Sequence, residues 1–112
     1  MNPIEELKRR LSNYTEEQII IKEHAFVRGI IRQICEEEIK TNIRNPERLQ
    51  YAIRQEARHA HEEKYDCYFD YGKNQCHRYV LVINRNCIVC TVIKINRRWQ
   101  EYAERKAKGG QQ

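Results

Sequence analysis

The sequence predicts an α+β fold in which helices come first, an antiparallel β-meander of three or more strands follows, and a helix ends the chain. The main evidence is a change of hydrophobic period near Lys64, from helical spacing to the two-residue alternation of strands. Two short polar turns, at 72–74 and 84–86, separate the apolar runs. The 112 residues fit one domain, which we place at 1–108, followed by a frayed tail at 109–112.

The N-terminal part of the chain is expected to be helical. Asn2 suits a helix cap and Pro3 suits the first helical position, so the first helix should run to about Leu11. Two more helices are expected at about 22–33 and 34–44, where apolar residues recur every three or four positions.

The segment that follows Pro46 also has helical spacing. Its apolar residues recur at intervals of four, four and three, which predicts a fourth helix through Leu49, Ile53, Ala57 and Ala60. The β-branched triplet at 19–21 fits either a short strand or the beginning of the next helix, and the sequence leaves both open.

The second half of the chain predicts the sheet. The expected strands cover about 64–71, 76–83 and 87–95. The second and third strands are nearly continuous apolar runs, which is typical of central strands. Asn96 is then expected to cap a last helix that turns Trp99, Tyr102 and Ala103 inward.

The charge balance favours a polyanionic partner. The chain carries a net charge of +5 with a pI near 9.0, so nucleic acid is the first candidate, and no membrane contact is expected. Basic side chains are concentrated near the C-terminus: Arg97, Arg98, Arg105, Lys106 and Lys108. Of these, Arg97, Arg98 and Arg105 are the candidates for phosphate contacts.

Several classes of protein are disfavoured. No apolar run approaches the ~18 residues of a membrane span, and the N-terminus does not resemble a secretory signal, so we expect a cytoplasmic protein with reduced cysteines. Glycine-rich phosphate loops and the motifs of serine hydrolases and metalloproteases are missing. Cys87 and Cys90 have the spacing of zinc ligands, but residues three apart in a strand face opposite sides. We therefore expect no metal and no cofactor.

The segment 22–34 holds the strongest candidate for chemistry. His24, Arg28 and Arg32 are four residues apart and would form one polar stripe on a helix, beside an apolar face that includes Val27 and Ile30. An imidazole can act as general acid or base, and two guanidinium groups can bind a phosphate and stabilise its transition state. These groups suffice for metal-independent cleavage of RNA, whose own 2′-hydroxyl is the nucleophile.

The predicted sheet is expected to complete this site. Thr91 offers a hydroxyl, and Lys94 and Tyr79 are further candidates for contact with a nucleic acid. Thr91 and Lys94 have opposite strand parity, so both face one site only if a β-bulge intervenes.

The pattern His24-Ala25-x-x-Arg28-x-x-x-Arg32, followed by a helix that ends at Asn45-Pro46, resembles small prokaryotic toxin-like domains of the RelE/barnase-type ribonuclease fold. A late strand with a threonine after apolar residues, here Thr91, is similar too. The resemblance implies an endoribonuclease toxin that acts without metal through His24, Arg28, Arg32 and Thr91, and that an antitoxin protein neutralises.

Two other functions fit the same sequence. One is a non-catalytic nucleic-acid-binding module that uses Arg97, Arg98 and Arg105 of the basic last helix. The other is a small structural or interaction protein of a virus or mobile element, such as a homodimer that exposes a strand edge.

Overall fold

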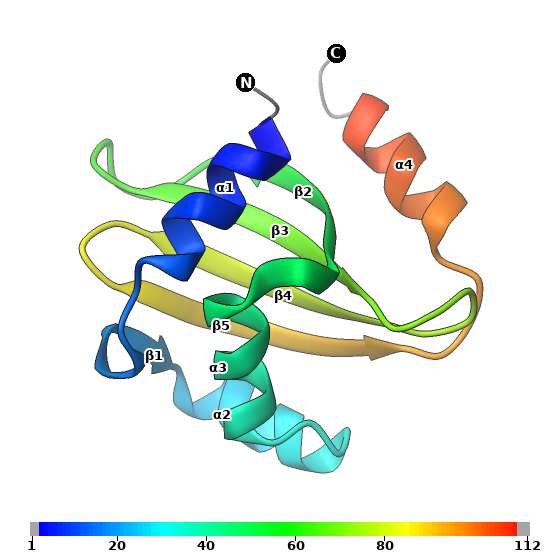
Figure 1. Cartoon of the computed structure of the whole chain (residues 1–112), viewed down its shortest axis with the longest axis horizontal. Coiled ribbons are helices and arrows are strands. Elements are labelled where there is room, and N and C mark those ends of the chain that lie inside the picture. The colour runs from blue at the N-terminus through cyan, green and yellow to red at the C-terminus, as the bar shows by residue number, and fades with distance from the viewer. Residues whose placement is uncertain (1–2, 110–112) are drawn as a thin grey trace.

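The computed structural model describes residues 3–109, which form a five-stranded mixed sheet with helices packed on both of its faces (Figure 1). The elements in chain order are α1 (Pro3–Ser12), the 3-10 turn η1 (Glu16–Gln18), β1 (Ile19–Ile21), α2 (Glu23–Ile31), α3 (Glu36–Arg44), the 3-10 turn η2 (Pro46–Arg48), β2 (Leu49–Gln55), β3 (Glu63–Asp70), β4 (Cys76–Ile83), β5 (Cys87–Ile95) and α4 (Gln100–Gly109).

The α+β class is confirmed, and the sheet adds β1 at one edge and β2 at the other to the three strands that were located in the sequence. The strand order is β1-β5-β4-β3-β2, in which β2 to β5 form an antiparallel meander. The triplet at 19–21 is the strand β1, and it pairs parallel to β5 with Ile19 opposite Cys87. The backbone N–H of Lys22 continues this ladder by donating to the carbonyl oxygen of Val89 at 3.0 Å.

The helix predicted after Pro46 is wrong. The chain makes one 3-10 turn and then enters β2, which pairs with β3. A four-residue spacing satisfies a helix, but it also places residues on one side of a strand, so the pattern alone did not decide. An irregularity in the β2–β3 register lies between Leu49 and Tyr51, and it turns Tyr51 and Ile53 toward the side chains that pack with Trp99.

The other helices are close to their predicted positions. The first helix is confirmed from Pro3, whereas the predicted cap Asn2 lies outside the described residues. The second helix ends at Ile31, because Gln33 adopts a positive φ of 59° and reverses the chain before α3.

The predicted start of the last helix is corrected. Helix α4 begins at Gln100, four residues after Asn96, and the Asn96 side chain instead accepts a hydrogen bond from Gln75 at 3.0 Å. Trp99 and Ala103 are buried as expected, but Tyr102 is exposed. Gly109, which we assigned to the tail, is the last residue of α4, and 110–112 lie outside the described residues.

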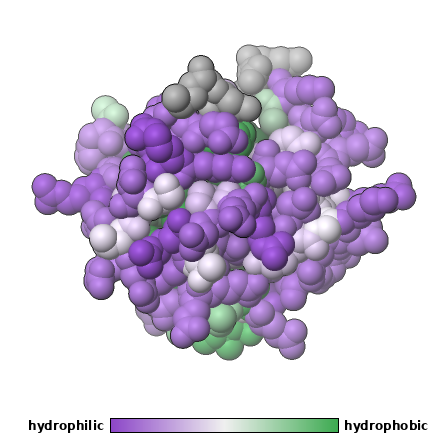
Figure 2. All heavy atoms as spheres, in the orientation of Figure 1, coloured by the Kyte–Doolittle hydropathy of each residue, from purple (hydrophilic) through white to green (hydrophobic). Residues whose placement is uncertain are grey.

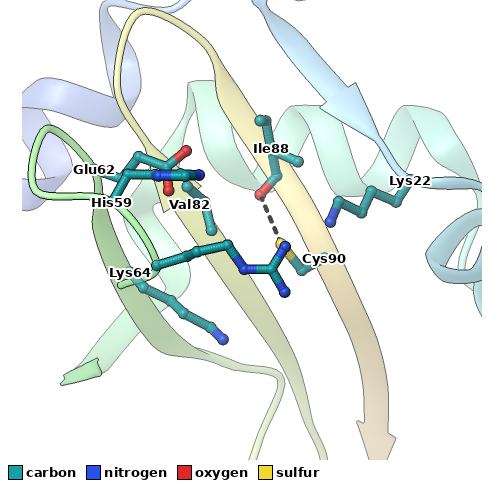
Figure 3. A pocket seen from close by; sticks show the side chains of 8 residues that line it. Lys22, His59, Glu62, Lys64, Val82, Ile88 and Cys90 are labelled. Carbon is teal, nitrogen blue, oxygen red and sulfur yellow. Dashed lines mark hydrogen bonds between the residues drawn. The ribbon is translucent and has the colours of Figure 1, made fainter. Parts of the chain in front are cut away.

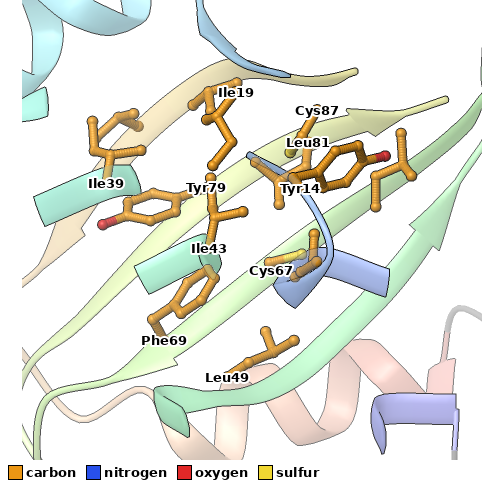
Figure 4. Packing of buried hydrophobic residues seen from close by; sticks show 14 of the residues in the cluster. Tyr14, Ile19, Ile39, Ile43, Leu49, Cys67, Phe69, Tyr79, Leu81 and Cys87 are labelled. Atoms are coloured by element: carbon orange, nitrogen blue, oxygen red, sulfur yellow. The ribbon is translucent and has the colours of Figure 1, made fainter. Parts of the chain in front are cut away.

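The main core lies between the sheet and the helices α1 and α3 (Figure 4). Leu11 of α1 and Ile43 of α3 are fully buried against Phe69 and Leu81 of the strands. We call this side of the sheet the inner face. Burying each such side chain contributes about 1.5–3 kcal/mol, so this layer supplies most of the apolar stabilisation.

A second, smaller cluster lies on the opposite side, which we call the outer face. Trp99 and Ala103 from the α4 region pack there on Tyr68 and Cys76. Tyr68 lies between Cys67 and Phe69, which both belong to the main core, so strand alternation places it on the outer face.

A buried hydrogen-bond network links α3 to the inner face. The amide of Asn42 donates to the hydroxyl groups of Tyr71 and Tyr79 at 2.8 and 2.9 Å, and the Tyr71 hydroxyl donates to Glu38 at 2.7 Å. The His77 Nδ1 atom lies 3.0 Å from the Tyr79 hydroxyl. The Tyr79 hydroxyl oxygen already accepts a hydrogen bond from Asn42, so the hydroxyl proton can be donated to the neutral imidazole of His77.

This network predicts a loss of stability in weak acid. Burial lowers the pKa of His77 to about 4, against 6.5 for the ordinary side chain. Between these values the unfolded chain binds a proton that the folded chain does not, so the free energy of unfolding falls as the pH falls. The two pKa values imply a loss on the order of 3 kcal/mol from pH 7 to pH 4.

Urea denaturation at intervals over this pH range measures the effect. The variant His77→Gln keeps a hydrogen-bond acceptor but cannot titrate, so its stability should vary much less over the same range. A wild-type protein that is equally stable at both ends of the range would contradict the buried, neutral imidazole.

Candidate nucleic-acid interface on the outer face

Helix α4 covers only the part of the outer face that lies near β2. Helix α4 packs along β2, whereas the outer side chains of β4 and β5 are half-buried. They are Val80, Val82, Ile88, Thr91 and Ile93. The register between β4 and β5 shifts at Cys90, because Leu81 pairs with Val89 while Val80 pairs with Thr91. This bulge turns Thr91 to the outer face together with Val80.

A basic hollow of about 220 Å³ lies at one end of this face (Figure 3). Lys22, at the junction of β1 and α2, lines it on the side of Cys90 of β5, and Lys64 of β3 lines the opposite side. Arg58 and His59 from the β2–β3 loop also line it. Glu62 is the only acidic residue in the lining, so the hollow has an excess of positive charge.

A second basic hollow, of about 350 Å³, lies where β5 leads into α4. Its cations come from Arg97, Arg98 and Arg105, and its aromatic groups are Trp99 and Tyr102. Tyr102 is 39% exposed, and the Nζ atom of Lys106 lies over its ring, 5.6 Å from the ring centroid. Arg97, Arg98 and Arg105 were predicted as nucleic-acid contacts, and the structure brings these three residues together in one hollow.

Between the two hollows, the charged side chains in the middle of the outer face neutralise one another. Arg78 donates to both carboxylate oxygens of the buried Asp66, at 2.7 and 2.6 Å, so neither charge is free to bind a ligand strongly. Thr91 and half-buried aliphatic side chains lie beside this pair. Strand β5 has nine residues, which corresponds to roughly 30 Å between the ends of the face.

The His24, Arg28 and Arg32 stripe lies on α2, away from both hollows. His24 and Arg28 are exposed, and neither lines the hollows described above. One Nη atom of Arg32 donates to the carbonyl oxygen of Val92 at 3.3 Å, which fixes this guanidinium against β5. His24 and Arg28 therefore lie on α2, whereas Arg32 follows its last residue and holds the end of the helix to the sheet.

The predicted residues of the sheet divide between its two faces. Thr91 is on the outer face, whereas Lys94 pairs with His77 and belongs to the inner side, as the parity argument required. Tyr79 is 0% exposed, and its hydroxyl group is part of the Asn42 network. Tyr79 is therefore a core residue, and the prediction that it contacts nucleic acid is corrected by its burial.

Sequence reasoning missed the hollow that contains Lys22 and Lys64. Arg58 and His59 fall within the segment that was predicted to be a helix, but they lie in the β2–β3 loop, where the rings of His59 and His61 stack with their centroids 5.6 Å apart. The arginine and histidine residues are close together in the sequence, so a basic cluster could have been predicted there. That Lys22 lies beside this cluster could not have been predicted, because it depends on the parallel pairing of β1 with β5.

The cysteines are mostly buried thiols. Cys67, Cys76 and Cys87 are fully buried, and burial raises the pKa of Cys76 and of Cys87 to about 12, so both stay protonated near neutral pH. Cys87 belongs to the main core and Cys90 lines the outer hollow, so the CxxC pair is split between the faces. Within residues 3–109, no three His, Cys, Asp or Glu side chains are placed to hold a metal ion.

Comparison with protein-family models, with curated proteins and with solved structures gave no match to this chain. Over the residues that the structure describes, no helix has both the length and the apolar character needed to cross a membrane.

Proposed function

We propose that this protein binds single-stranded nucleic acid, and RNA in preference to DNA, across the outer face of its sheet. The observation that carries the proposal is the presence of two basic hollows at opposite ends of one open, half-apolar sheet face. The preference for RNA rests on the resemblance of the helix-borne pattern to ribonuclease-fold toxins.

Single strands are bound by surfaces of this composition. Cations follow the phosphates, and bases stack or pack on aromatic and apolar side chains between them. Here Lys64 and Arg58 would contact phosphates at one end, Arg98 and Arg105 at the other, and Tyr102 offers an exposed ring. A face of roughly 30 Å accommodates a few nucleotides, near the low end of the ~4–16 that a single-strand-binding domain covers.

Fluorescence anisotropy with a labelled single-stranded RNA of about ten nucleotides tests the proposal. The double variants Arg58→Ala/Lys64→Ala and Arg98→Ala/Arg105→Ala should each weaken binding by about tenfold, which is ~1.4 kcal/mol. Each should also reduce the slope of log K against log salt by about 1.4, since each removes two phosphate contacts.

Arg9→Ala/Arg44→Ala is the matched control, because it removes the same charge from α1 and α3 on the inner side of the sheet. It should retain nearly the full affinity. Equal losses in all three double variants would mean that only net charge matters, and would contradict a defined interface.

Metal-independent cleavage of RNA is a second candidate, and one observation favours it. The hollow at Lys22 and Lys64 also contains the imidazole of His59, so a proton-transfer group lies beside cations that can stabilise a phosphorane-like transition state. The binding mixtures, incubated with a chelator, report cleavage directly. Loss of products with His59→Ala would place the chemistry in the hollow, and loss with His24→Ala would place it on α2.

The toxin and antitoxin roles remain predictions from the resemblance. Absence of cleavage by the wild-type chain, with binding intact, would leave a non-catalytic nucleic-acid-binding module.

A further inference from the structure

The two basic hollows of the outer face differ in size and in chemistry. The hollow at Lys22 and Lys64, which we call the lysine hollow, has a volume of about 220 Å³. The hollow beside α4 measures about 350 Å³ and contains the side chains of Trp99 and Tyr102. Pockets that enclose a whole drug-sized molecule are roughly 300–1,000 Å³. The lysine hollow therefore suits a group as small as a phosphate, whereas the α4 hollow has room for a base.

The lysine hollow lies where the sheet ends. Val82 and Ile88 belong to its lining, and each is one residue from the end of its strand, next to the turn between β4 and β5. Arg58 and His59 of the β2–β3 loop also line it (Figure 3). A nucleic-acid strand that runs along the face from the α4 hollow would meet this loop, so the group that fits here is the end of the strand.

The sheet register places the two lysines on opposite sides of an apolar floor. Lys64 pairs with Val82, Val82 pairs with Ile88, and Ile88 pairs with Ile20, which gives one row across four strands. Lys22 follows two residues after Ile20. Three strand spacings correspond to roughly 14 Å across the sheet. A small anion seated over Val82 and Ile88 would thus have a flexible lysine side chain on each side.

The positive charges of the lysine hollow are not neutralised by the protein. Lys22, Arg58 and Lys64 belong to no ion pair within residues 3–109. Glu62 is the one carboxylate in the lining, and it is not paired with any of these cations. Three cations against one carboxylate leave an excess of positive charge that a phosphate can neutralise with charge-assisted hydrogen bonds.

Hydrophilic surface by itself does not mark such a site. The side of the molecule that carries α1 and α3 is also largely hydrophilic (Figure 2). Four cations of these two helices, however, are held in ion pairs with glutamates: Lys8, Arg9, Arg10 and Lys40. The lysine hollow differs because none of its lysine and arginine side chains has a carboxylate partner in the described part of the chain.

We propose that the lysine hollow binds the terminal phosphate of a nucleic-acid strand, which is a phosphomonoester at its 5′ or 3′ end. This inference rests on the proposed function and names the group that occupies one end of the interface. A terminal phosphate carries a charge of about −1.5 to −2 near pH 7, whereas a phosphodiester within the strand carries a single negative charge. Three unpaired cations therefore favour the terminal group, and Arg58 can donate to two of its oxygens at once.

Competition binding with three unlabelled RNAs of one sequence, about ten nucleotides long, tests the proposal. The first strand has hydroxyl groups at both ends, the second has a 5′-phosphate and the third a 3′-phosphate, and each displaces the same labelled RNA. At least one phosphorylated strand should bind about tenfold more tightly than the first, the gain expected from an added charge-assisted hydrogen bond. The strand that gains affinity identifies the end that occupies the hollow.

Lys22→Ala/Arg58→Ala should abolish this preference, so that the three strands bind within about twofold of one another. Both side chains are exposed, so the variant should unfold at nearly the wild-type temperature. Arg98→Ala/Arg105→Ala is the matched control, because it removes the same charge from the α4 hollow. It should weaken the binding of all three strands and leave the preference among them unchanged.

The outcomes separate this inference from the proposed function. Wild-type protein that binds all three strands equally would overturn the inference and leave the binding of single strands standing. A preference that persists in Lys22→Ala/Arg58→Ala, or that Arg98→Ala/Arg105→Ala abolishes equally, would overturn the inference as well. Failure of the labelled RNA to bind wild-type protein at low salt would refute the proposed function and the inference together.

Discussion

Trp99→Ala is expected to lower the free energy of unfolding by about 3–5 kcal/mol, the range for removing a buried tryptophan. Trp99 is 1% exposed, and its ring stacks parallel to Tyr68 with the centroids 6.2 Å apart. Tyr51 meets the same ring edge-on at 6.1 Å. The indole N–H donates to the carbonyl oxygen of Gly72 at 2.7 Å, so the substitution removes both the packing and this hydrogen bond.

Urea denaturation of the full chain measures this loss. Trp99→Phe keeps an aromatic ring but lacks the N–H donor, so it should be destabilised by a smaller amount, about 1–2 kcal/mol. Tyr102→Ala removes an exposed ring from the same helix and should stay within about 0.5 kcal/mol of the wild type. Similar losses for Trp99→Ala and Tyr102→Ala would contradict the placement of Trp99 as the anchor of α4.

Asp66→Asn is expected to lower the free energy of unfolding by about 3 kcal/mol. Asp66 is 1% exposed, and it accepts two hydrogen bonds from Arg78. Removing one partner of a buried ion pair costs about 3–5 kcal/mol, because the other charge loses its compensation. The Arg78 side chain is 23% exposed and can reach water, which favours the lower end of that range.

Two comparisons isolate the ion pair. Asp66→Asn/Arg78→Gln removes both charges and should recover part of the stability that Asp66→Asn loses. Glu6→Gln breaks the exposed pair with Arg9 and should cost less than about 1 kcal/mol. An Asp66→Asn variant no less stable than Glu6→Gln would show that the carboxylate is not buried against Arg78.

The meander could be predicted because local signals agreed there. Alternation through Cys67 and Phe69, followed by turns at 72–74 and 84–86, fixes both the strands and their antiparallel order. The segment 49–55 could not be assigned, since its four-residue spacing suits helix and strand equally. Its conformation is decided by pairing with β3 and by Trp99, which lies far away in the sequence.

Only those parts of the candidate interface that are close together in the sequence could be predicted. Arg97, Arg98 and Arg105 are close in sequence, so their clustering is local and visible. Lys22 and Lys64 line the same hollow only because β1 joins the sheet beside β5. The helix that carries His24 and Arg28 was predicted from its spacing. The side of this helix that faces the protein was not, because it consists of the small residues Ala25 and Gly29, which contribute little to the hydrophobic pattern.

The measurement that tests the nucleic-acid interface most directly is a map of backbone amide chemical-shift changes on adding a single-stranded RNA to isotope-labelled wild-type protein. The interface proposed here predicts the largest changes at the outer residues of β4 and β5, in the loop at 56–62, and over 97–105, with α1 and α3 little affected. Changes centred on the inner helices, or no changes at low salt, would contradict it.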